Sequence, residues 1–307
     1  MCIDIVIVNW NAGLLVKECI DSIIKYKGAL VSKIVVVDNN SSDDSSNFLD
    51  NYTEVNLIRA SENLGFSKAC NLGASYCDAE FILFLNPDTQ LHVSTLSNVH
   101  HFMHKKKNAK VGICGVQLYD ENGQVARSCS RKPSLSALFA HAIGMTKIFP
   151  SFGDAMREWD HSSTRIVDQV IGAFFFVRRN LYLSMNGFDE RFFVYFEEVD
   201  FSVRAKNNGW HSVYFSGAEA FHLGGGTSYQ VKAKRAFYSN RSRIQYIIKH
   251  FNAPTVLIAL FVTLCIEPIS RSVSALSKES NISFKENLRA YYMLYSWFFQ
   301  FKFGEKK

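Results

Sequence analysis

Phe81-Ile-Leu-Phe-Leu-Asn-Pro-Asp-Thr-Gln90 contains the clearest evidence for the fold of this 307-residue chain. Its first five residues are all apolar, which predicts a strand buried on both faces, as in a mostly parallel sheet. Because Pro87 cannot donate a hydrogen bond to a neighbouring strand, we expect the strand to end there. Asp88 then lies at the carboxyl end of a strand, where open α/β sheets bind ligands. Its carboxylate suits a divalent cation that also holds substrate phosphates, although an ordinary turn aspartate gives the same pattern.

Strands and helices are predicted to alternate through the amino-terminal third of the chain. The expected strands are Ile3–Val8, Ile34–Val37, Val55–Ile58 and Phe81–Leu85. Apolar residues at helical spacing follow in Leu14–Tyr26, and Gly65 permits a tight entry into a helix within Glu62–Gly73. This alternation predicts a Rossmann-like α/β fold with a doubly wound, mostly parallel sheet.

Later segments continue the same pattern. Strands are expected at Val111–Leu118, Gly172–Val177 and Trp210–Phe215, and a helix at Glu197–Asn208. Tyr119–Phe152 is mixed in character, and we interpret it as an excursion on the ligand side of the sheet.

The composition is typical of a packed protein in a reducing compartment. Hydrophobic residues make up 48% of the chain, which is ample for a core. The seven cysteines are scattered without a C-x-x-C pair, which argues against a disulfide framework or a structural zinc. We expect no signal peptide, because Asp4 and Asn9 interrupt the first apolar run.

The net charge of +6 is unevenly distributed. No acidic residue occurs between Ala220 and Ile266, a segment that contains several lysines and arginines. Such a segment could face anionic lipid, a phosphate-bearing substrate or nucleic acid, or could simply be a solvated helix face.

The carboxyl-terminal part is apolar and aromatic. Val256–Ile266 is expected to end at Glu267-Pro268, which would leave it too short to cross a bilayer unaided. Leu288–Phe303 predicts a helix lying in a membrane interface, against the alternative of a helix docked on the domain. Its aromatic and apolar face comprises Leu288, Tyr291, Tyr292, Tyr295, Phe298 and Phe299, with Trp297, Lys302, Lys306 and Lys307 beside or after it.

Polar residues cluster where the predicted strands end. The clusters are Asn9–Asn11, Asp38–Ser41, Asn63–Asn71 and Asn86–Asp88. A carboxylate such as Asp38 can accept hydrogen bonds from a base or a ribose, and a helix that begins near Gly65 can direct N–H groups toward phosphate. Glu197 and Glu198 follow on a turn, and either acid could take a proton from an attacking hydroxyl. No Walker A sequence is present, so P-loop hydrolysis of ATP is not favoured.

Six motifs in order, between about residues 3 and 250, resemble those of the family 2 glycosyltransferases of the GT-A fold, in particular the bacterial rhamnosyltransferase-like branch. They are Val6–Asn11, Val37–Ser41, Glu62–Gly73, Phe84–Thr89, Gly172–Arg179 and Gly187–Arg204. The resemblance implies a nucleoside contact for Asp38. It also implies a nucleotide-binding edge that contains Asn9, Asn11, Asn40, Asn63, Gly65, Asn71 and Asn86.

The resemblance implies a metal site and a catalytic base as well. Asn86-Pro87-Asp88 stands where the family has an Asp-x-Asp motif and keeps only the last acid, so Asp88 would hold Mg²⁺ or Mn²⁺. His222 is a possible metal or diphosphate contact. Glu198 occupies the base position, with Asp200 as the alternative; Asp200 could instead form an i,i+4 pair with Arg204.

These observations predict a GT-A domain over residues 1–250, with a nucleotide-binding half (1–118) and an acceptor half (119–250). A helical, membrane-associating extension is predicted over residues 251–307. The resemblance implies inverting, metal-dependent transfer of L-rhamnose from dTDP-L-rhamnose to a lipid-diphosphate-linked or polysaccharide acceptor in bacterial surface glycan (O-antigen or capsule) synthesis. We expect a cytoplasmic protein in peripheral contact with the inner face of the membrane, and no nucleic acid partner.

Three alternatives remain at this stage. A UDP-hexose-dependent transferase of the same fold would carry the same motifs. A non-catalytic sugar- or lipid-binding subunit would bind the donor without turnover. Receiver domains also end a buried strand with an aspartate, but they are far shorter and do not need the Glu197-Glu198 and His222 clusters.

Overall fold

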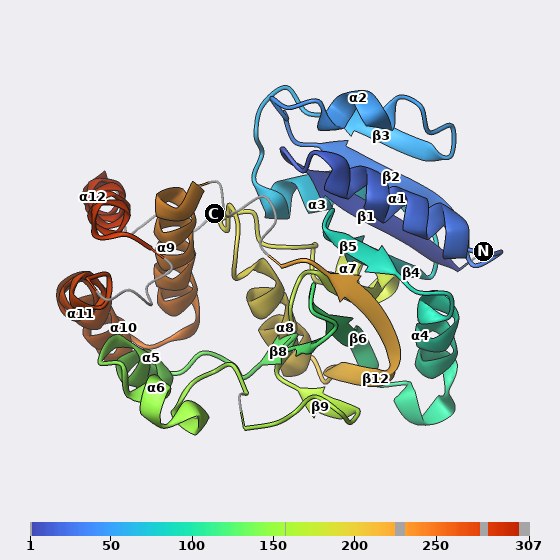
Figure 1. Ribbon diagram of the computed structural model, residues 1–307. Coiled ribbons are helices and arrows are strands. Elements are labelled where there is room, and N and C mark those ends of the chain that lie inside the picture. Colours follow the sequence, from blue (N-terminus) through green and yellow to red (C-terminus); the bar gives the residue numbers. More distant parts are fainter. Residues whose placement is uncertain (1, 157, 225–230, 277–281, 301–307) are drawn as a thin grey trace. The chain divides into compact units, whose positions relative to one another are not determined.

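The computed structural model describes residues 2–156, 158–224, 231–276 and 282–300 (Figure 1). The chain divides into two compact units, which we call the sheet unit and the helical unit. The sheet unit comprises Met1–Lys132, Ala155–Phe193 and Glu197–Thr227, and the helical unit comprises Pro133–Asp154, Val194–Phe196 and Ser228–Lys307.

The sheet unit is built on a ten-stranded mixed sheet, counted over the described residues. Along its main path the order is β3 (Val55–Arg59), β2 (Val31–Asp38), β1 (Ile3–Asn9), β4 (Phe81–Leu85), β11 (Phe174–Arg178), β6 (Val111–Tyr119), β12 (His211–His222) and β5 (Thr89–Leu91). Strands β7 (Val125–Ala126) and β9 (Arg165–Val167) pair with β6 and β12, while β8 (Cys129–Ser130) and β10 (Gln169–Val170) form a small separate sheet.

The predicted doubly wound, mostly parallel sheet is confirmed. Strands β1, β2, β3 and β4 are parallel neighbours, and β6 is parallel to β12. Strand β11 interrupts the run because it is antiparallel to both β4 and β6. The apolar run that begins at Phe81 forms β4, and all five of its residues are buried.

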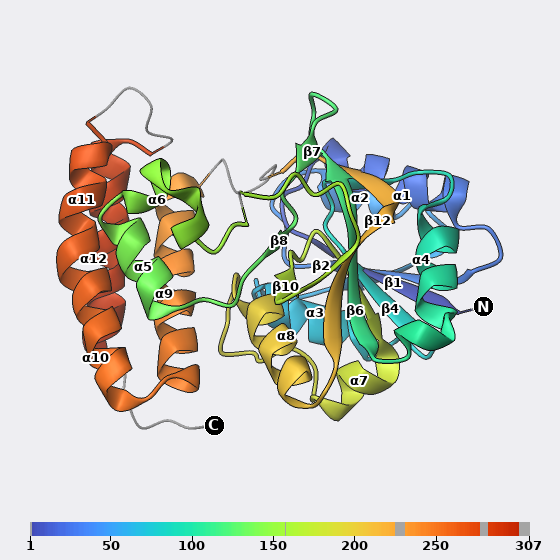
Figure 2. The same ribbon diagram turned by 90° about the horizontal axis from the view of Figure 1, so that it is seen from below.

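Helices cover both faces of the sheet, because alternate strand residues point to opposite sides. Ile3, Ile5 and Ile7 pack with α1 (Leu14–Tyr26), α2 (Ser45–Leu49) and α4 (Thr95–His104). Val6 and Val8 pack with the other layer, which consists of α3 (Phe66–Ala74), α7 (Arg179–Ser184) and α8 (Glu197–Asn207), and Figure 2 shows the two layers on either side of the strands. The short helix η1 (Lys106–Asn108) follows α4.

The helical unit contains α5 (Leu135–Ala142), α6 (Met145–Ile148), η2 (Pro150–Phe152), α9 (Lys232–His250), α10 (Ala253–Phe261), η4 (Val262–Ile266), α11 (Glu267–Ser274) and α12 (Phe284–Gln300). We expected a boundary at residue 250, but the division falls before Ser228. The reason is that α9 packs on α10 and α12. Residues 133–154 also belong to this unit, since α5 packs on α10, η4 and α11.

The expectation that Glu267-Pro268 ends the apolar helix is wrong. Ala253–Ser274 is one helix of 22 residues, long and apolar enough to cross a membrane by length and composition. Proline is tolerated in a first helical turn, and Pro268 occupies that place in α11, directly after the π-helical turn η4.

The predicted apolar face of α12 is divided between the interior and the surface. Tyr291 is buried, and the hydroxyl of Tyr295 donates to the carbonyl oxygen of Leu264 at 2.5 Å. By contrast, Leu288, Tyr292 and Phe299 are exposed. The last part of the predicted segment, with Lys302, Phe303, Lys306 and Lys307, lies outside the described residues.

Candidate active site

The candidate site begins where β1 and β2 end side by side. Asn9 and Asp38 are register partners in these parallel strands. The Nδ2 group of Asn9 donates to Asp38 Oδ1 at 2.8 Å and to the hydroxyl of Ser45 at 2.9 Å. Asp38 is only 5% exposed, so Asn9 fixes the orientation of a nearly covered carboxylate. The role of Asn9 is therefore to position Asp38.

Asn11 and Asn40 shape the loops at this edge, and both have left-handed backbone angles. The side-chain Oδ1 atom of Asn11 accepts a hydrogen bond from the Ser42 backbone amide at 2.7 Å. The backbone amide of Asn11 donates to the Ser41 hydroxyl at 3.1 Å. Asn40 is exposed. Hydrogen bonds therefore join the loop after β1 to the loop after β2 beside Asp38. Of the predicted nucleotide-binding residues in these loops, Asn40 has a side chain that faces solvent.

Asn39, which lies in the polar cluster Asp38–Ser41 but was given no role of its own, connects the end of β2 to the entry of α3. Its Oδ1 atom accepts from the Leu64 amide at 2.8 Å, and its Nδ2 group donates to Asn63 Oδ1 at 3.1 Å. Asn63 Oδ1 also accepts from the Gly65 amide at 2.9 Å. Asn63 therefore has a structural role in the turn, whether or not it also meets a nucleotide. Its neighbours in the chain give no sign of these long-range bonds.

The entry of α3 is packed directly against the segment that leads to the acidic turn. The Phe66 amide donates to the carbonyl oxygen of Phe193 at 2.6 Å. Gly65 has a φ of +80°, and a Cβ atom added there would lie 2.4 Å from that same oxygen. We expected N–H groups at this helix start to face phosphate, but the Phe66 donor is already used within the protein.

Asn71 on α3 has all its polar positions engaged by another part of the sheet unit. Its Nδ2 group donates to the carbonyl oxygen of Phe188 at 2.9 Å and to Glu190 Oε1 at 3.0 Å. Its Oδ1 atom accepts from the Tyr182 hydroxyl at 2.5 Å and from the Phe188 amide at 2.9 Å. These bonds favour a structural role for Asn71 over the predicted nucleotide contact.

Asp88 and His222 meet where β4 and β12 end. His222 pairs with Thr89 in the β5–β12 ladder, which places its Nε2 atom 3.3 Å from Asp88 Oδ1. That nitrogen is buried and has no hydrogen-bond partner among the described residues. The backbone amide of Asn86 donates to the carbonyl oxygen of Ala173, and the backbone amide of Leu223 donates to the carbonyl oxygen of Asp88. The backbone therefore holds both ends of the pair.

The Asp88–His222 pair fits part of a divalent-cation site. A carboxylate and an imidazole nitrogen that makes no hydrogen bond among the described residues face each other, and both groups are ordinary ligands of such ions. Over the described chain, no group of three or more histidine, cysteine or acidic side chains could hold a metal. A cation bound here would therefore need further ligands from a diphosphate and from water.

Glu197 and Glu198 open helix α8 after two consecutive residues, Tyr195 and Phe196, with left-handed backbone angles. In each glutamate, Oε2 is buried and has no hydrogen-bond partner among the residues described. Burial raises the pKa of Glu198 to about 7. Burial, together with the charge of Glu198, raises the pKa of Glu197 well above its ordinary value. Both buried acids therefore hold a proton more tightly than an exposed glutamate, and a pKa of about 7 allows Glu198 to exchange one near neutral pH.

Asp200 differs from these two acids because its carboxylate forms an ion pair with the guanidinium group of Arg204. It is fully buried, and Arg204 Nε donates to its Oδ2 atom at 2.7 Å, as the i,i+4 alternative predicts. Arg204 also donates to the carbonyl oxygens of Met185 and Gly187. This geometry favours Glu198 over Asp200 as the base.

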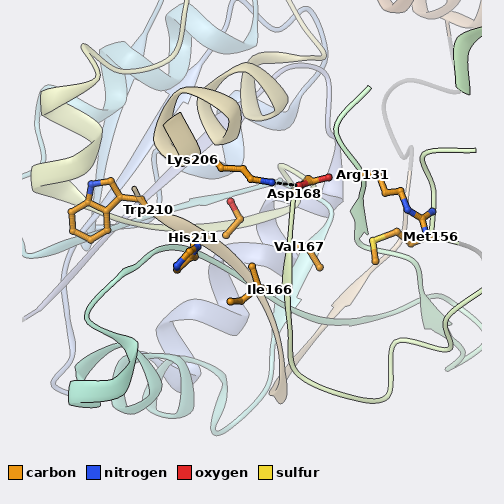
Figure 3. A pocket seen from close by; sticks show the side chains of 9 residues that line it. Arg131, Met156, Ile166, Val167, Asp168, Lys206, Trp210 and His211 are labelled. Atoms are coloured by element: carbon orange, nitrogen blue, oxygen red, sulfur yellow. Dashed lines mark hydrogen bonds and ion pairs between the residues drawn. The ribbon is translucent and has the colours of Figure 1, made fainter. Parts of the chain in front are cut away.

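A hollow of about 350 Å³ in the sheet unit lies away from these residues. Trp210, His211 and Ser212 line it at the start of β12 (Figure 3). His222 is at the other end of that strand. Its charged groups form ion pairs, such as Lys206 with Asp168 at 2.7 Å, drawn in Figure 3. We therefore assign it no part in the candidate active site.

Comparison with known proteins identifies sequence relatives of this chain. The family described as Glycosyl transferase family 2 matches residues 4–180. An N-acetylglucosaminyl-diphospho-decaprenol L-rhamnosyltransferase of Mycobacterium tuberculosis is 30% identical over 204 residues, which cover 62% of this chain and 66% of the relative. The rhamnosyltransferase WbbL of Escherichia coli is 28% identical over 222 residues, which cover 69% of this chain and 78% of the relative.

Solved structures confirm the expected GT-A fold. A mannosyltransferase of Pyrobaculum calidifontis, solved in complex with GDP-Man and Mn²⁺, aligns with a TM-score of 0.57 at 15% identity, over 97% of this chain and 79% of that one. At this identity the likeness concerns the fold alone.

Proposed function

Because this chain belongs to glycosyltransferase family 2, we propose that it transfers L-rhamnose from dTDP-L-rhamnose to a lipid-diphosphate-linked acceptor in bacterial surface glycan synthesis, such as that of O-antigen or capsule. The sugar is proposed from the names of the two rhamnosyltransferase relatives. The proposal includes a cytoplasmic protein that acts on its lipid-linked acceptor at the inner face of the cytoplasmic membrane.

The proposed reaction is a single displacement at the anomeric carbon of the donor sugar. The carboxylate of Glu198 takes the proton of the acceptor hydroxyl as its oxygen bonds to the anomeric carbon. The bond between that carbon and the diphosphate oxygen breaks at the same time, and its electron pair leaves with the nucleoside diphosphate. No covalent intermediate on the protein is needed, and the configuration at the anomeric carbon is inverted.

The other residues of the site position the donor. Asp38, oriented by Asn9, accepts hydrogen bonds from the nucleoside. Asp88 and His222 would hold Mg²⁺ or Mn²⁺ on the diphosphate. The bound cation would neutralise the charge that develops on the leaving group.

The juxtaposition of Asp88 and His222 at the carboxyl edge of the sheet is the observation that carries this proposal. A binding subunit of the same fold would have no need for an ionisable base with a pKa near neutrality, whereas a pKa of about 7 suits Glu198 for proton transfer at physiological pH. The acidic turn therefore favours an enzyme over a non-catalytic subunit.

A donor screen tests the proposal. The full-length protein is incubated with Mg²⁺, a polyprenyl-diphosphate-linked acceptor and, in turn, dTDP-rhamnose, UDP-glucose, UDP-N-acetylglucosamine and GDP-mannose, and released nucleoside diphosphate is measured. Release from dTDP-rhamnose that depends on the acceptor is the expected result. Preference for a UDP-hexose would replace the donor in the proposal, and donor binding without release would refute the enzyme assignment.

A further inference from the structure

The long helix Ala253–Ser274 of the helical unit has a continuous apolar stripe on its surface. Leu257, Phe261, Ile269 and Val273 are between 60% and 69% exposed. These positions, with the exposed Cys265 between Phe261 and Ile269, are each four residues apart, so they lie along one side of the helix. We call Leu257, Phe261, Cys265, Ile269 and Val273 the apolar stripe.

The opposite side of this helix is buried and carries polar groups beside apolar ones such as Ala259 and Val262. Glu267 has no exposed surface, and both of its carboxylate oxygens accept from Arg243 of α9, at 2.9 and 2.5 Å. Arg243 also donates to Asn240 Oδ1 at 3.1 Å, and Thr263, on the same side of the long helix, is fully buried. A second polar contact joins Asn287 of α12 to Ser272 at 3.1 Å.

The long helix therefore buries its charged Glu267 and exposes a row of large apolar side chains, whereas a soluble helix turns its apolar side inward and its charged side toward water. Charged side chains that face the interior in ion pairs, beneath an apolar exterior, are characteristic of helices in contact with lipid. Most of the exposed large apolar side chains in the described chain also belong to the helical unit.

Helix α9 indicates that the long helix lies along a bilayer and does not cross it. The two helices pack together, and α9 carries six lysines and arginines without a single acidic residue. Lys232, Lys234 and Arg235 are exposed. Each such charge would be costly in the hydrocarbon region, whereas the same charges attract the headgroups of anionic lipids.

We propose that the helical unit is a monotopic membrane anchor, in which the apolar stripe enters the outer part of an anionic lipid bilayer and the exposed lysines of α9, Lys232 and Lys234, contact its headgroups. The helix is roughly 33 Å long at 1.5 Å per residue, so the stripe offers an extended line of contact parallel to the membrane. On α12, Leu288 and Tyr292 are exposed at the same spacing and add a second line. This inference adds a means of attachment to the membrane location proposed above. It rests on the proposed function only for the choice of the cytoplasmic face of the membrane.

Flotation of the full-length protein with vesicles tests the anchor. Vesicles of phosphatidylcholine with phosphatidylglycerol are compared with vesicles of phosphatidylcholine alone, without donor or acceptor. The double variant Leu257→Glu/Phe261→Glu is expected to partition at least tenfold less than the wild type, because both side chains already face outward and the charges can be solvated in the free protein. Val93→Glu, at a residue of the sheet unit that is 75% exposed, is the matched control and should partition as the wild type does.

Each outcome has a defined meaning. Equal flotation of the double variant and the wild type would overturn the anchor. Equal binding to the two lipid mixtures would overturn the role of the α9 lysines. A wild type that does not float, but forms a dimer that the double variant cannot form, would assign the stripe to a second copy of this chain. Flotation without nucleoside diphosphate release would leave the anchor intact and refute the proposed function alone.

Discussion

Asp88 Oδ1 and His222 Nε2 lie 3.3 Å apart, brought together by the pairing of β5 with the end of β12. Asp88→Asn keeps the shape of the side chain and removes its charge. We expect it to weaken binding of Mn²⁺ in the presence of dTDP by at least about 10-fold, since loss of even an outer-shell partner of a metal ligand costs about 10- to 100-fold in affinity, and to lower kcat in parallel. Mn²⁺ binding can be followed by electron paramagnetic resonance, independently of turnover.

Asp44→Asn is the matched control, because it makes the same change at an exposed acid in another part of the sheet unit. It should leave both Mn²⁺ binding and kcat unchanged. Unaltered Mn²⁺ binding in Asp88→Asn would show that the cation, if one is used, is held elsewhere.

The pH dependence of the reaction should follow the carboxyl group of Glu198. Its pKa is raised to about 7, and the base must be deprotonated to accept a proton. We therefore expect kcat to rise with pH below about 7 and to level off above it. Glu198→Gln should lower kcat by about 10²- to 10⁴-fold, the usual contribution of a general base. It should also abolish the rise of kcat with pH below about 7, which we call the acid limb.

Glu197→Gln provides a second test of the same pair. Burial and the charge of Glu198 raise the pKa of Glu197 well above its ordinary value, so we expect Glu197→Gln to leave the titration of Glu198 largely unchanged. The acid limb of the variant should stay near pH 7. A shift of the limb by a full pH unit toward acid would mean that Glu197 is ionised in the wild type and that the two protons are distributed differently.

Asp200→Asn should affect folding more than chemistry. The variant leaves Arg204 without its carboxylate in a part-buried position, and breaking a buried pair costs about 3–5 kcal/mol of unfolding free energy. Urea unfolding should show this loss, while kcat per folded molecule at low temperature stays within a few-fold of the wild type. A folded variant with a loss of kcat as large as that of Glu198→Gln would make Asp200 the base.

Gly65→Ala should destabilise the entry of α3 for two reasons. The backbone is left-handed there, and the new methyl group would meet the Phe193 carbonyl oxygen at 2.4 Å. Gly123→Ala isolates the first cause, because Gly123 has a φ of +70° with nothing within 4 Å of the added atom. We expect the loss in unfolding free energy to be about 1 kcal/mol at Gly123 and clearly greater at Gly65. Equal losses would show that the contact with Phe193 contributes nothing.

The sequence was sufficient for the framework of the sheet unit. Unbroken apolar runs such as Phe81–Leu85 can be satisfied only by a strand covered on both faces, and the polar residues after them consequently meet at one edge. Asp38 and Asp88 were located in this way, because their positions follow from where strands end.

The roles of the asparagines could not be obtained from the same pattern. Asn63 and Asn71 look like ligand contacts in the sequence, yet their hydrogen bonds go to residues of the protein, and for Asn71 those residues are more than a hundred positions away in the chain. Local patterns carry no information about such partners. The same applies to Glu267, which seemed to end a helix until its partner Arg243 was known.

The hydrogen bonds of Asn71 have a consequence for engineering this protein. The segment that leads to the acidic turn is fastened by its backbone at Phe188 to a side chain of α3, and by the Phe193 carbonyl oxygen to the start of that helix. Residues 182–200 therefore cannot be exchanged for the corresponding segment of another protein without changing their contacts with α3. A chimaera that imports this segment from a relative should import the matching α3 with it, because the hydrogen bonds that position the segment end on that helix.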